Sequence, residues 1–187
     1  MQNALAVGVD GIEHFAGLTC EGSRIDDELL DEAARRAVYV DLTLGNDRAF
    51  HAFLPAPPPP LAELMARLGV TSFDQLYASQ FAVLRRLRQH GVAVITGVDS
   101  GMGPPKRHGN AWRTVGELME AGYPVNEALA AATSLAAAAC GLAGVTGRLA
   151  EGYAADILVT DGDLSHDISL LSQPREVLVR GTPVDLT

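Results

Sequence analysis

Residues 92–99 read Val-Ala-Val-Ile-Thr-Gly-Val-Asp, and this stretch decides the fold class. Seven uncharged residues followed by an aspartate are typical of a parallel strand that is covered on both faces. Two shorter apolar segments precede it, at residues 7–14 and 38–44. We expect all three segments to be strands, with His14 at the end of the first and Asp99 at the end of the last.

Helical patterns separate these segments. Residues 26–37 carry leucines and alanines at helical spacing, with acidic side chains in the first turn and arginines in the last. A longer helix is predicted after Ser72, which forms a capping box with Gln75, and it ends at Gly91. Further helices are expected at residues 61–68, 111–121 and 125–140. This alternation implies right-handed βαβ crossovers and an α/β fold, either an open, doubly wound sheet or part of a (β/α) barrel.

The last part of the chain has a different pattern. Short strand candidates at residues 147–151, 155–161 and 177–182 are separated by Gly, Asp and Pro turns, with no long helix between them. We therefore expect a small antiparallel β appendage after the α/β part.

The composition excludes some partners. The 187 residues include 23 acidic and 14 basic side chains, a net charge of −9, which disfavours a nucleic-acid partner. The longest apolar stretch, residues 128–142, is too short and too rich in alanine to cross a membrane. Cys20 and Cys140 lie far apart and no signal-peptide pattern precedes them, so the expected location is the cytoplasm.

His14 and Asp99 are the candidate functional residues. In parallel α/β folds the working side chains lie at the carboxyl ends of the strands, and both residues are expected there. An imidazole and a carboxylate at one edge would bind a divalent metal such as zinc, or act as a general base and the group that orients it. The alternatives are a loop histidine held by a backbone carbonyl and an aspartate that caps a turn.

Six stretches, taken in order, resemble the metal-dependent amidohydrolase superfamily, and the tail Gly-Tyr-Ala-Ala-Asp-Ile at residues 152–157 is the most specific of their motifs. The stretches are residues 8–14, 42–44, 95–101, 108–110, 126–133 and 147–159. The nearest branch is similar to imidazolonepropionase and prolidase. The resemblance implies strands six to eight of a (β/α)8 TIM-type barrel at residues 1–143, followed by strands of a small β-sandwich domain at residues 144–187.

The resemblance also implies roles for single residues. His14 is similar to the metal ligand on strand six, and Asp99 to the strand-eight aspartate that binds metal and takes a proton from the attacking water. His108 is similar in position to a residue that faces the substrate, and Lys106 and Arg107 beside it are either flexible surface charges or contacts for a substrate carboxylate. The implied enzyme hydrolyses carbon–nitrogen bonds other than ordinary peptide bonds, in amide, cyclic amide or dipeptide-like small molecules, with zinc as the expected ion.

Several features of that family are missing from this sequence. It contains no His-X-His pair, and the segments that would carry a bridging lysine and a further histidine have no counterpart. Val98 stands where threonine is usual. A full barrel needs about 250 residues, and a catalytic zinc has three protein ligands. We therefore expect a carboxyl-terminal fragment or truncated reading frame whose site is incomplete.

Other interpretations stay open at this point. The chain would be a non-catalytic remnant, or a half barrel completed by a homo-oligomer or by a partner that supplies the first five strands. A deaminase of the same superfamily is a third reading. His51, His90 and His166 lack partners at ligand spacing, and we expect them to be solvated or to cap helices.

Overall fold

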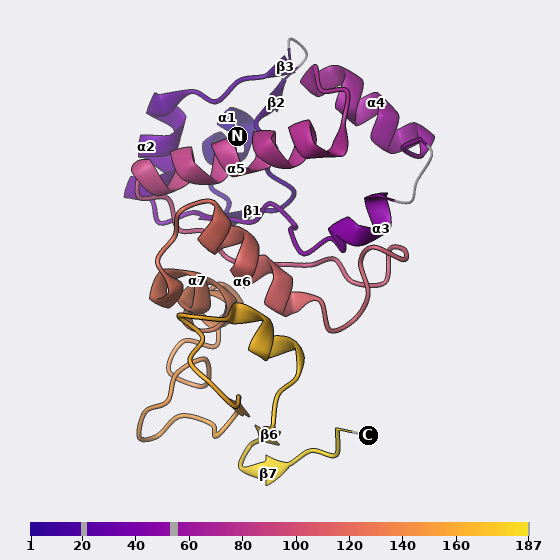
Figure 1. Ribbon diagram of the computed structural model, residues 1–187. Helices are drawn as coiled ribbons and strands as arrows, with labels where there is room; N and C mark the ends of the chain where they lie inside the picture. The colour runs from indigo at the N-terminus through magenta and orange to yellow at the C-terminus, as the bar shows by residue number, and fades with distance from the viewer. Residues whose placement is uncertain (20–21, 53–55, 187) are drawn as a thin grey trace.

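The computed structural model describes residues 1–19, 22–52 and 56–186. In Figure 1 most of the chain forms a group of helices around short parallel strands, and the carboxyl-terminal part, which carries β6 and β7, lies below them. None of the described helices is long and apolar enough to cross a membrane.

Three parallel segments lie at the centre of the helical part. β1 (Gly11–Ile12) pairs with β4 (Tyr39–Val40), with Gly11 opposite Tyr39. Val40 in turn forms a parallel bridge with Val94. The spatial order is therefore β1, β4 and the segment around Val94, as a partial α/β barrel requires.

These strands are shorter than the sequence predicts. Val7 belongs to α1 (Gln2–Val7), which ends at Gly8 with a φ of 79°, so the expected strand over residues 7–14 is reduced to β1. At the other end, His14, Thr43 and Asp99 all have positive φ, and this conformation takes the chain out of the extended ladder.

The helices cover the parallel segments and form the core with them. The main ones are α2 (Asp27–Arg35), α5 (Phe73–Gln89) and α6 (Ala111–Glu120). Their apolar faces supply side chains with no exposed surface, each worth about 1.5–3 kcal/mol of burial. The fully buried residues at this centre include Leu30, Leu84, Leu87 and Leu118 of these helices and Val40 of β4.

The start of α5 confirms the predicted capping box. The Gln75 N–H donates to Ser72 Oγ at 3.2 Å, and Gln75 Oε1 accepts a hydrogen bond from the Thr71 N–H at 2.8 Å. The first bond satisfies one of the amides that the first turn leaves without a helical partner, and the second ties Gln75 to Thr71, the residue before the cap. Before this helix lie α3 (Arg48–Ala52) and α4 (Pro59–Leu68). α4 begins two residues earlier than expected, because proline is tolerated in a first helical turn.

The single helix expected over residues 125–140 is wrong. The chain forms α7 (Val125–Ala132) and α8 (Ser134–Ala139), separated by Thr133 with φ −130° and ψ −90°. Thr133 Oγ1 donates to the Leu129 carbonyl at 2.7 Å, a side-chain bond that competes with the regular helical ladder.

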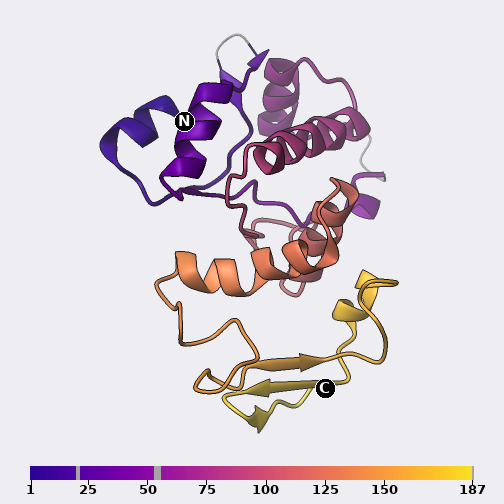
Figure 2. The same ribbon diagram turned by 90° about the vertical axis from the view of Figure 1, so that its left-hand side faces the viewer.

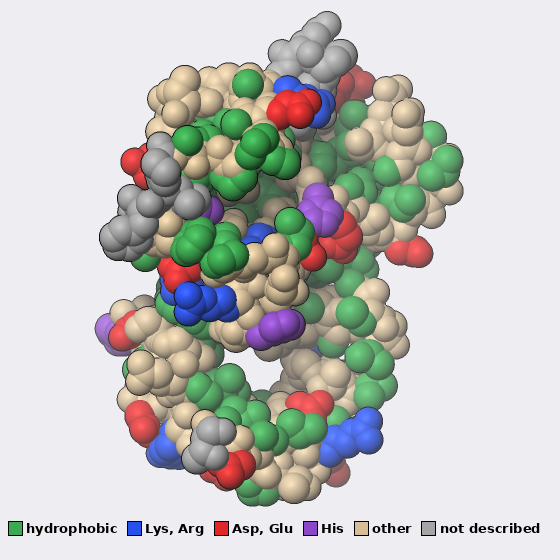
Figure 3. Space-filling model, turned by 90° about the vertical axis from the view of Figure 1, so that its right-hand side faces the viewer, with side chains coloured by type: hydrophobic (Ala, Val, Ile, Leu, Met, Phe, Trp, Pro, Cys, Tyr) green, Lys and Arg blue, Asp and Glu red, His purple; other side chains and the backbone are tan. Residues whose placement is uncertain are grey.

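The carboxyl-terminal unit is the expected antiparallel sheet. β5 (Ile157–Val159), β6 (Glu176–Val179) and β7 (Thr182–Pro183) pair in that order, with Ile157 opposite Leu178. Figure 2 shows the sheet beneath the α7–α8 pair, and Figure 3 shows an opening between it and the rest of the molecule. A short 3₁₀ helix, η1 (Ile168–Ser172), packs against α6.

Two local expectations fail in the connecting segments. Residues 147–151 form turns and not a strand, because Gly147 and Gly152 have φ values of 85° and 84° that a ladder does not accept. β2 (Leu18–Thr19) and β3 (Gly22–Ser23) pair antiparallel in a part of the chain where the sequence predicts no strand. The proposed boundary between residues 1–143 and 144–187 stays a prediction.

Candidate active site

The candidate site lies at the carboxyl ends of the three parallel segments. His14 follows β1, Thr43 follows β4, and Asp99 follows the segment that carries Val94. Their φ values are 54°, 55° and 56°, a left-handed conformation that is uncommon for residues other than glycine. Such backbone strain costs about 1–3 kcal/mol per residue and clusters at functional sites. The same backbone strain follows each of the three neighbouring parallel segments, which marks their carboxyl ends as the candidate site.

His14 is oriented by the neighbouring strand. Its Nδ1 lies 2.7 Å from Thr43 Oγ1, and the Thr43 N–H donates to the buried Asp41 carboxylate at 2.8 Å. Thr43 is buried, whereas the His14 side chain is exposed. In the tautomer with the proton on Nδ1, the Nε2 lone pair is free for a metal or a proton.

Asp41 lies beneath these residues and is in close contact with Gly97. A Cβ atom at position 97 would fall 2.1 Å from Asp41 Oδ2, so only glycine fits there. Glu13 lies next to the same carboxylate. Its hydrogen bond to the Asp41 side chain, with burial and the Asp41 charge in support, raises the pKa of Glu13 above its usual value. Carboxyl groups therefore form the floor of the site.

The structure brings His14 and Asp99 to one edge without direct contact between them. Both side chains are exposed. Lys106 links the end of β4 to the segment before Asp99, because its Nζ donates to the carbonyls of Thr43 at 2.5 Å and Val98 at 2.9 Å. Thr43 is the hydrogen-bond partner of His14, and Val98 directly precedes Asp99.

His108 lies on the loop that follows Asp99 and is exposed. Its Nε2 is 3.5 Å from the position that a Cβ atom on Gly101 would take, so the side chain turns back over its own loop. Its contact with substrate stays a prediction.

The donor types at this edge fit a divalent metal, but their number does not complete a site. An imidazole and a carboxylate are normal zinc ligands, and a catalytic zinc takes three protein ligands. Within the described ranges, no three His, Cys, Asp or Glu side chains are grouped so that they could hold an ion. His14 and Asp99 would therefore be part of a metal centre that needs at least one more ligand.

Two residues of the site, Lys106 and Thr43, have structural roles that the sequence did not indicate. Lys106 is half-buried and bonded to carbonyls, so a free surface charge is the wrong description. Thr43 received no role at all, because a threonine after a strand is common and its partner is 29 residues away. The sequence signals were its position at the end of the second predicted strand and its place in residues 42–44, one of the stretches that resemble the family.

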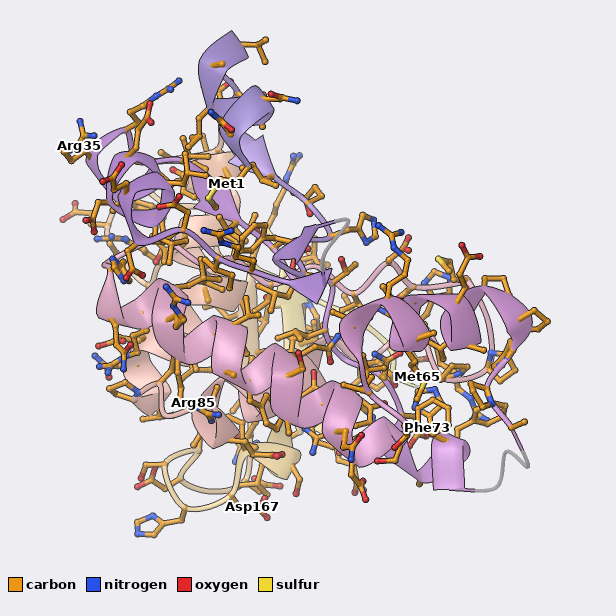
Figure 4. All side chains as sticks on the ribbon, turned by 90° about the horizontal axis from the view of Figure 1, so that it is seen from above. Met1, Arg35, Met65, Phe73, Arg85 and Asp167 are labelled. Carbon is orange, nitrogen blue, oxygen red and sulfur yellow. The ribbon has the colours of Figure 1, made fainter. Side chains whose placement is uncertain are left out.

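His51 is neither solvated nor a cap, contrary to expectation. It is buried, stacks on Phe73 with ring centroids 4.3 Å apart, and its Nδ1 lies 2.5 Å from the Tyr77 hydroxyl. Burial lowers the pKa of His51 and favours the neutral ring. Figure 4 shows Phe73 at the start of α5, near the α4 residue Met65 and far from Arg85. By contrast, His166 is solvated as expected, with a side chain that is 85% exposed.

Parallel segments joined by helices define an α/β protein, and in such folds ligands bind at the carboxyl ends of the strands. A sequence model of the Amidohydrolase family (Amidohydro_3) matches residues 24–185. The chain belongs to this family.

Solved structures agree in fold. The chain is similar to a putative prolidase from Bifidobacterium longum, with 28% identity and a TM-score of 0.70 over 98% of this chain and 44% of that one. It is also similar to an Xaa-Pro dipeptidase with bound methionine in its active site, with 22% identity and a TM-score of 0.78 over 98% and 42%. For phenylurea hydrolase B the values are 20%, 0.69, 98% and 40%.

The chain thus spans about two fifths of the length of the solved proteins it matches. These are barrel amidohydrolases, so the parallel segments correspond to part of a barrel. Which barrel strands they represent stays a prediction. No curated protein matches the sequence.

Proposed function

We propose that this chain provides one side of the active site of a metal-dependent hydrolase that cleaves carbon–nitrogen bonds. The observation that carries the proposal is the placement of His14 and Asp99 after the two parallel segments that flank β4, with His14 held by Thr43 at the end of β4. Membership of the amidohydrolase family supports it.

In this proposal each of the three site residues, His14, Thr43 and Asp99, has a distinct role. His14 would bind the metal through Nε2 while Thr43 fixes the ring, and Asp99 would bind through its carboxylate. A bound zinc ion would polarise the scissile carbonyl and lower the pKa of water to about 7. Asp99 would accept the proton of the attacking water and return it to the departing nitrogen.

The proposed substrates are small amides, cyclic amides and dipeptide-like molecules. The similar structures include proteins named as a prolidase and an Xaa-Pro dipeptidase, whose names refer to dipeptides. For this reason dipeptides belong in the panel, although the sequence favoured bonds other than ordinary peptide bonds.

The described residues offer two candidate ligands and no group of three, which favours a second candidate, a half barrel that is active only when a partner completes it. The segments on either side of β4 would offer free strand edges to such a partner, as open sheets do. A second copy of this chain and a different protein are both compatible with this candidate. The cytoplasmic location stays a prediction.

Zinc titration combined with a hydrolysis assay separates these candidates. We expect zinc binding that is lost in both His14→Ala and Asp99→Asn, and retained in His166→Ala, which removes an exposed histidine elsewhere. Hydrolysis of Xaa-Pro dipeptides or amides by the zinc-loaded chain would identify a complete enzyme. Zinc binding without turnover would favour the half barrel, and zinc binding that survives both variants would exclude the proposal.

A further inference from the structure

Lys106 is a cationic residue to which the proposed function assigns no role. It lies on the loop after Asp99 and is half-buried. Its Nζ donates to the backbone carbonyls of Thr43 at 2.5 Å, Val98 at 2.9 Å and Leu44 at 3.3 Å. An ammonium group has three N–H donors, so all of them are used. Lys106 therefore has no donor left for a substrate carboxylate.

The three acceptors belong to two of the three segments that end in the candidate site. Thr43 and Leu44 follow β4, and Val98 precedes Asp99. Thr43 and Asp99 have positive φ, which turns the peptide groups around them away from the parallel ladder. A buried carbonyl without a partner costs about 1–3 kcal/mol, and hydrogen bonds from a charged donor are stronger than neutral ones. Lys106 satisfies the carbonyls that the strained turns release.

The loop holds Lys106 firmly in this position. The Gly101 N–H donates to the Lys106 carbonyl at 2.8 Å, and the Lys106 N–H donates to the Gly103 carbonyl at 2.9 Å. The buried Asn110 side chain donates to Gly45 at 3.2 Å and to Pro105 at 3.1 Å. Hydrogen bonds within the loop thus hold the backbone of Lys106, and the three carbonyls hold its Nζ. The side chain is therefore fixed at both ends.

We propose that Lys106 is a positioning residue that sets the spacing between His14 and Asp99. It acts through their neighbours, since Thr43 orients His14 and Val98 carries Asp99. The inference rests on the proposed function, because it assigns Lys106 to the metal centre that His14 and Asp99 would form. Lys106 itself touches neither the metal nor the substrate.

The test compares Lys106→Met with the matched variant Arg107→Met. The side chain of Arg107, also on this loop, is exposed and forms no hydrogen bond or ion pair with any residue that the structure describes. Two quantities are measured in each protein. They are the NMR shifts of the His14 ring nitrogens and of the Thr43 and Asp99 amides without metal, and the dissociation constant for zinc.

We expect Lys106→Met to displace these signals and to raise the zinc dissociation constant about tenfold. Arg107→Met is expected to change neither, and Lys106→Arg to recover part of the affinity because it keeps a cationic donor.

The outcomes distinguish this inference from the proposed function. Unchanged signals and an unchanged dissociation constant in Lys106→Met would overturn the positioning role, while zinc binding by the parent chain would keep the function. If the parent chain binds no zinc but Lys106→Met displaces the signals, the proposed function is overturned and the spacing role of Lys106 is kept. If Lys106→Met does not fold, Lys106→Gln, which keeps one donor group, is judged by the same criteria.

Discussion

His14 Nδ1 and Thr43 Oγ1 lie 2.7 Å apart, although 29 residues separate them in the chain. The bond joins the ends of two neighbouring parallel strands and fixes the ring of the proposed metal ligand. Metal-binding histidines usually have such a partner on the second nitrogen, and its loss typically lowers metal affinity 10- to 100-fold. Thr43 is therefore as much a part of the site as His14.

The role of Thr43 predicts the effect of removing its hydroxyl group. Thr43→Val keeps the shape and burial but leaves His14 free to turn, so the zinc dissociation constant should rise at least about tenfold. Thr43→Ser keeps the hydroxyl and should stay close to the parent. Competition with a chromophoric chelator measures both constants. Equal zinc affinity in the valine variant would show that the bond does not orient the ring.

The contact between Gly97 and Asp41 predicts a stability effect. Gly97→Ala would place a methyl group 2.1 Å from Asp41 Oδ2, and we expect a loss of about 1–3 kcal/mol in the free energy of unfolding. Gly103→Ala is the matched control, because its nearest atom would be Pro105 Cδ at 3.8 Å. Urea unfolding measures both.

The same contact predicts coupling between the two positions. The double variant with Asp41→Ala should be more stable than the sum of the single changes implies, since the atom that the methyl group meets is gone. Strict additivity, or a Gly97→Ala variant as stable as Gly103→Ala, would contradict the contact.

Glu117 predicts a pH dependence. Burial raises the pKa of Glu117 above its usual value of about 4.5, against the opposing effects of the Gly45 N–H and Arg48. A raised folded-state pKa means that its contribution to stability is complete below about pH 4.5 and is lost as the pH rises through the folded value. The parent should thus lose stability relative to Glu117→Gln above pH 4.5, by at most about 1.4 kcal/mol per pH unit.

Urea unfolding of both proteins between pH 4 and 7 measures that difference, in which the other titrating groups largely cancel. Glu117 Oε2 accepts the Gly45 N–H at 2.6 Å, and Oε1 lies 3.4 Å from Arg48 Nε. A difference that moves in favour of the parent as the pH rises would mean that these partners outweigh burial.

The cap of α5 predicts a smaller effect. Ser72→Ala removes the acceptor for the Gln75 N–H and should cost about 1 kcal/mol of stability. Ser79→Ala, in the interior of the same helix, should cost less because alanine is the better helix former there. Thermal unfolding compares the two, and an equal cost would argue against the cap.

Local signals in the sequence predicted the helices well. α2 follows from apolar spacing and from acidic side chains in its first turn, and α5 from apolar spacing and the capping residue Ser72. These signals lie within a few residues of each other, so no knowledge of the tertiary structure is needed to use them. The break at Thr133 escaped prediction because alanine-rich sequence on both sides favours a continuous helix.

The candidate site was only partly predictable. Its position after the strands follows from the general logic of parallel α/β folds, which places His14 and Asp99 at one edge. The bonds that hold the site were not visible, because Thr43 to His14 and Lys106 to Thr43 join residues 29 and 63 positions apart. Positive φ at three non-glycine residues likewise leaves no mark in the sequence.

Zinc titration followed by NMR of the His14 ring nitrogens and the Asp99 carboxylate carbon tests the central claim most directly. One cation shared by both groups predicts that the Nε2 and carboxylate signals move together and saturate with the same dissociation constant. Movement of only one signal, or saturation at two different zinc concentrations, would mean that His14 and Asp99 do not bind the same ion.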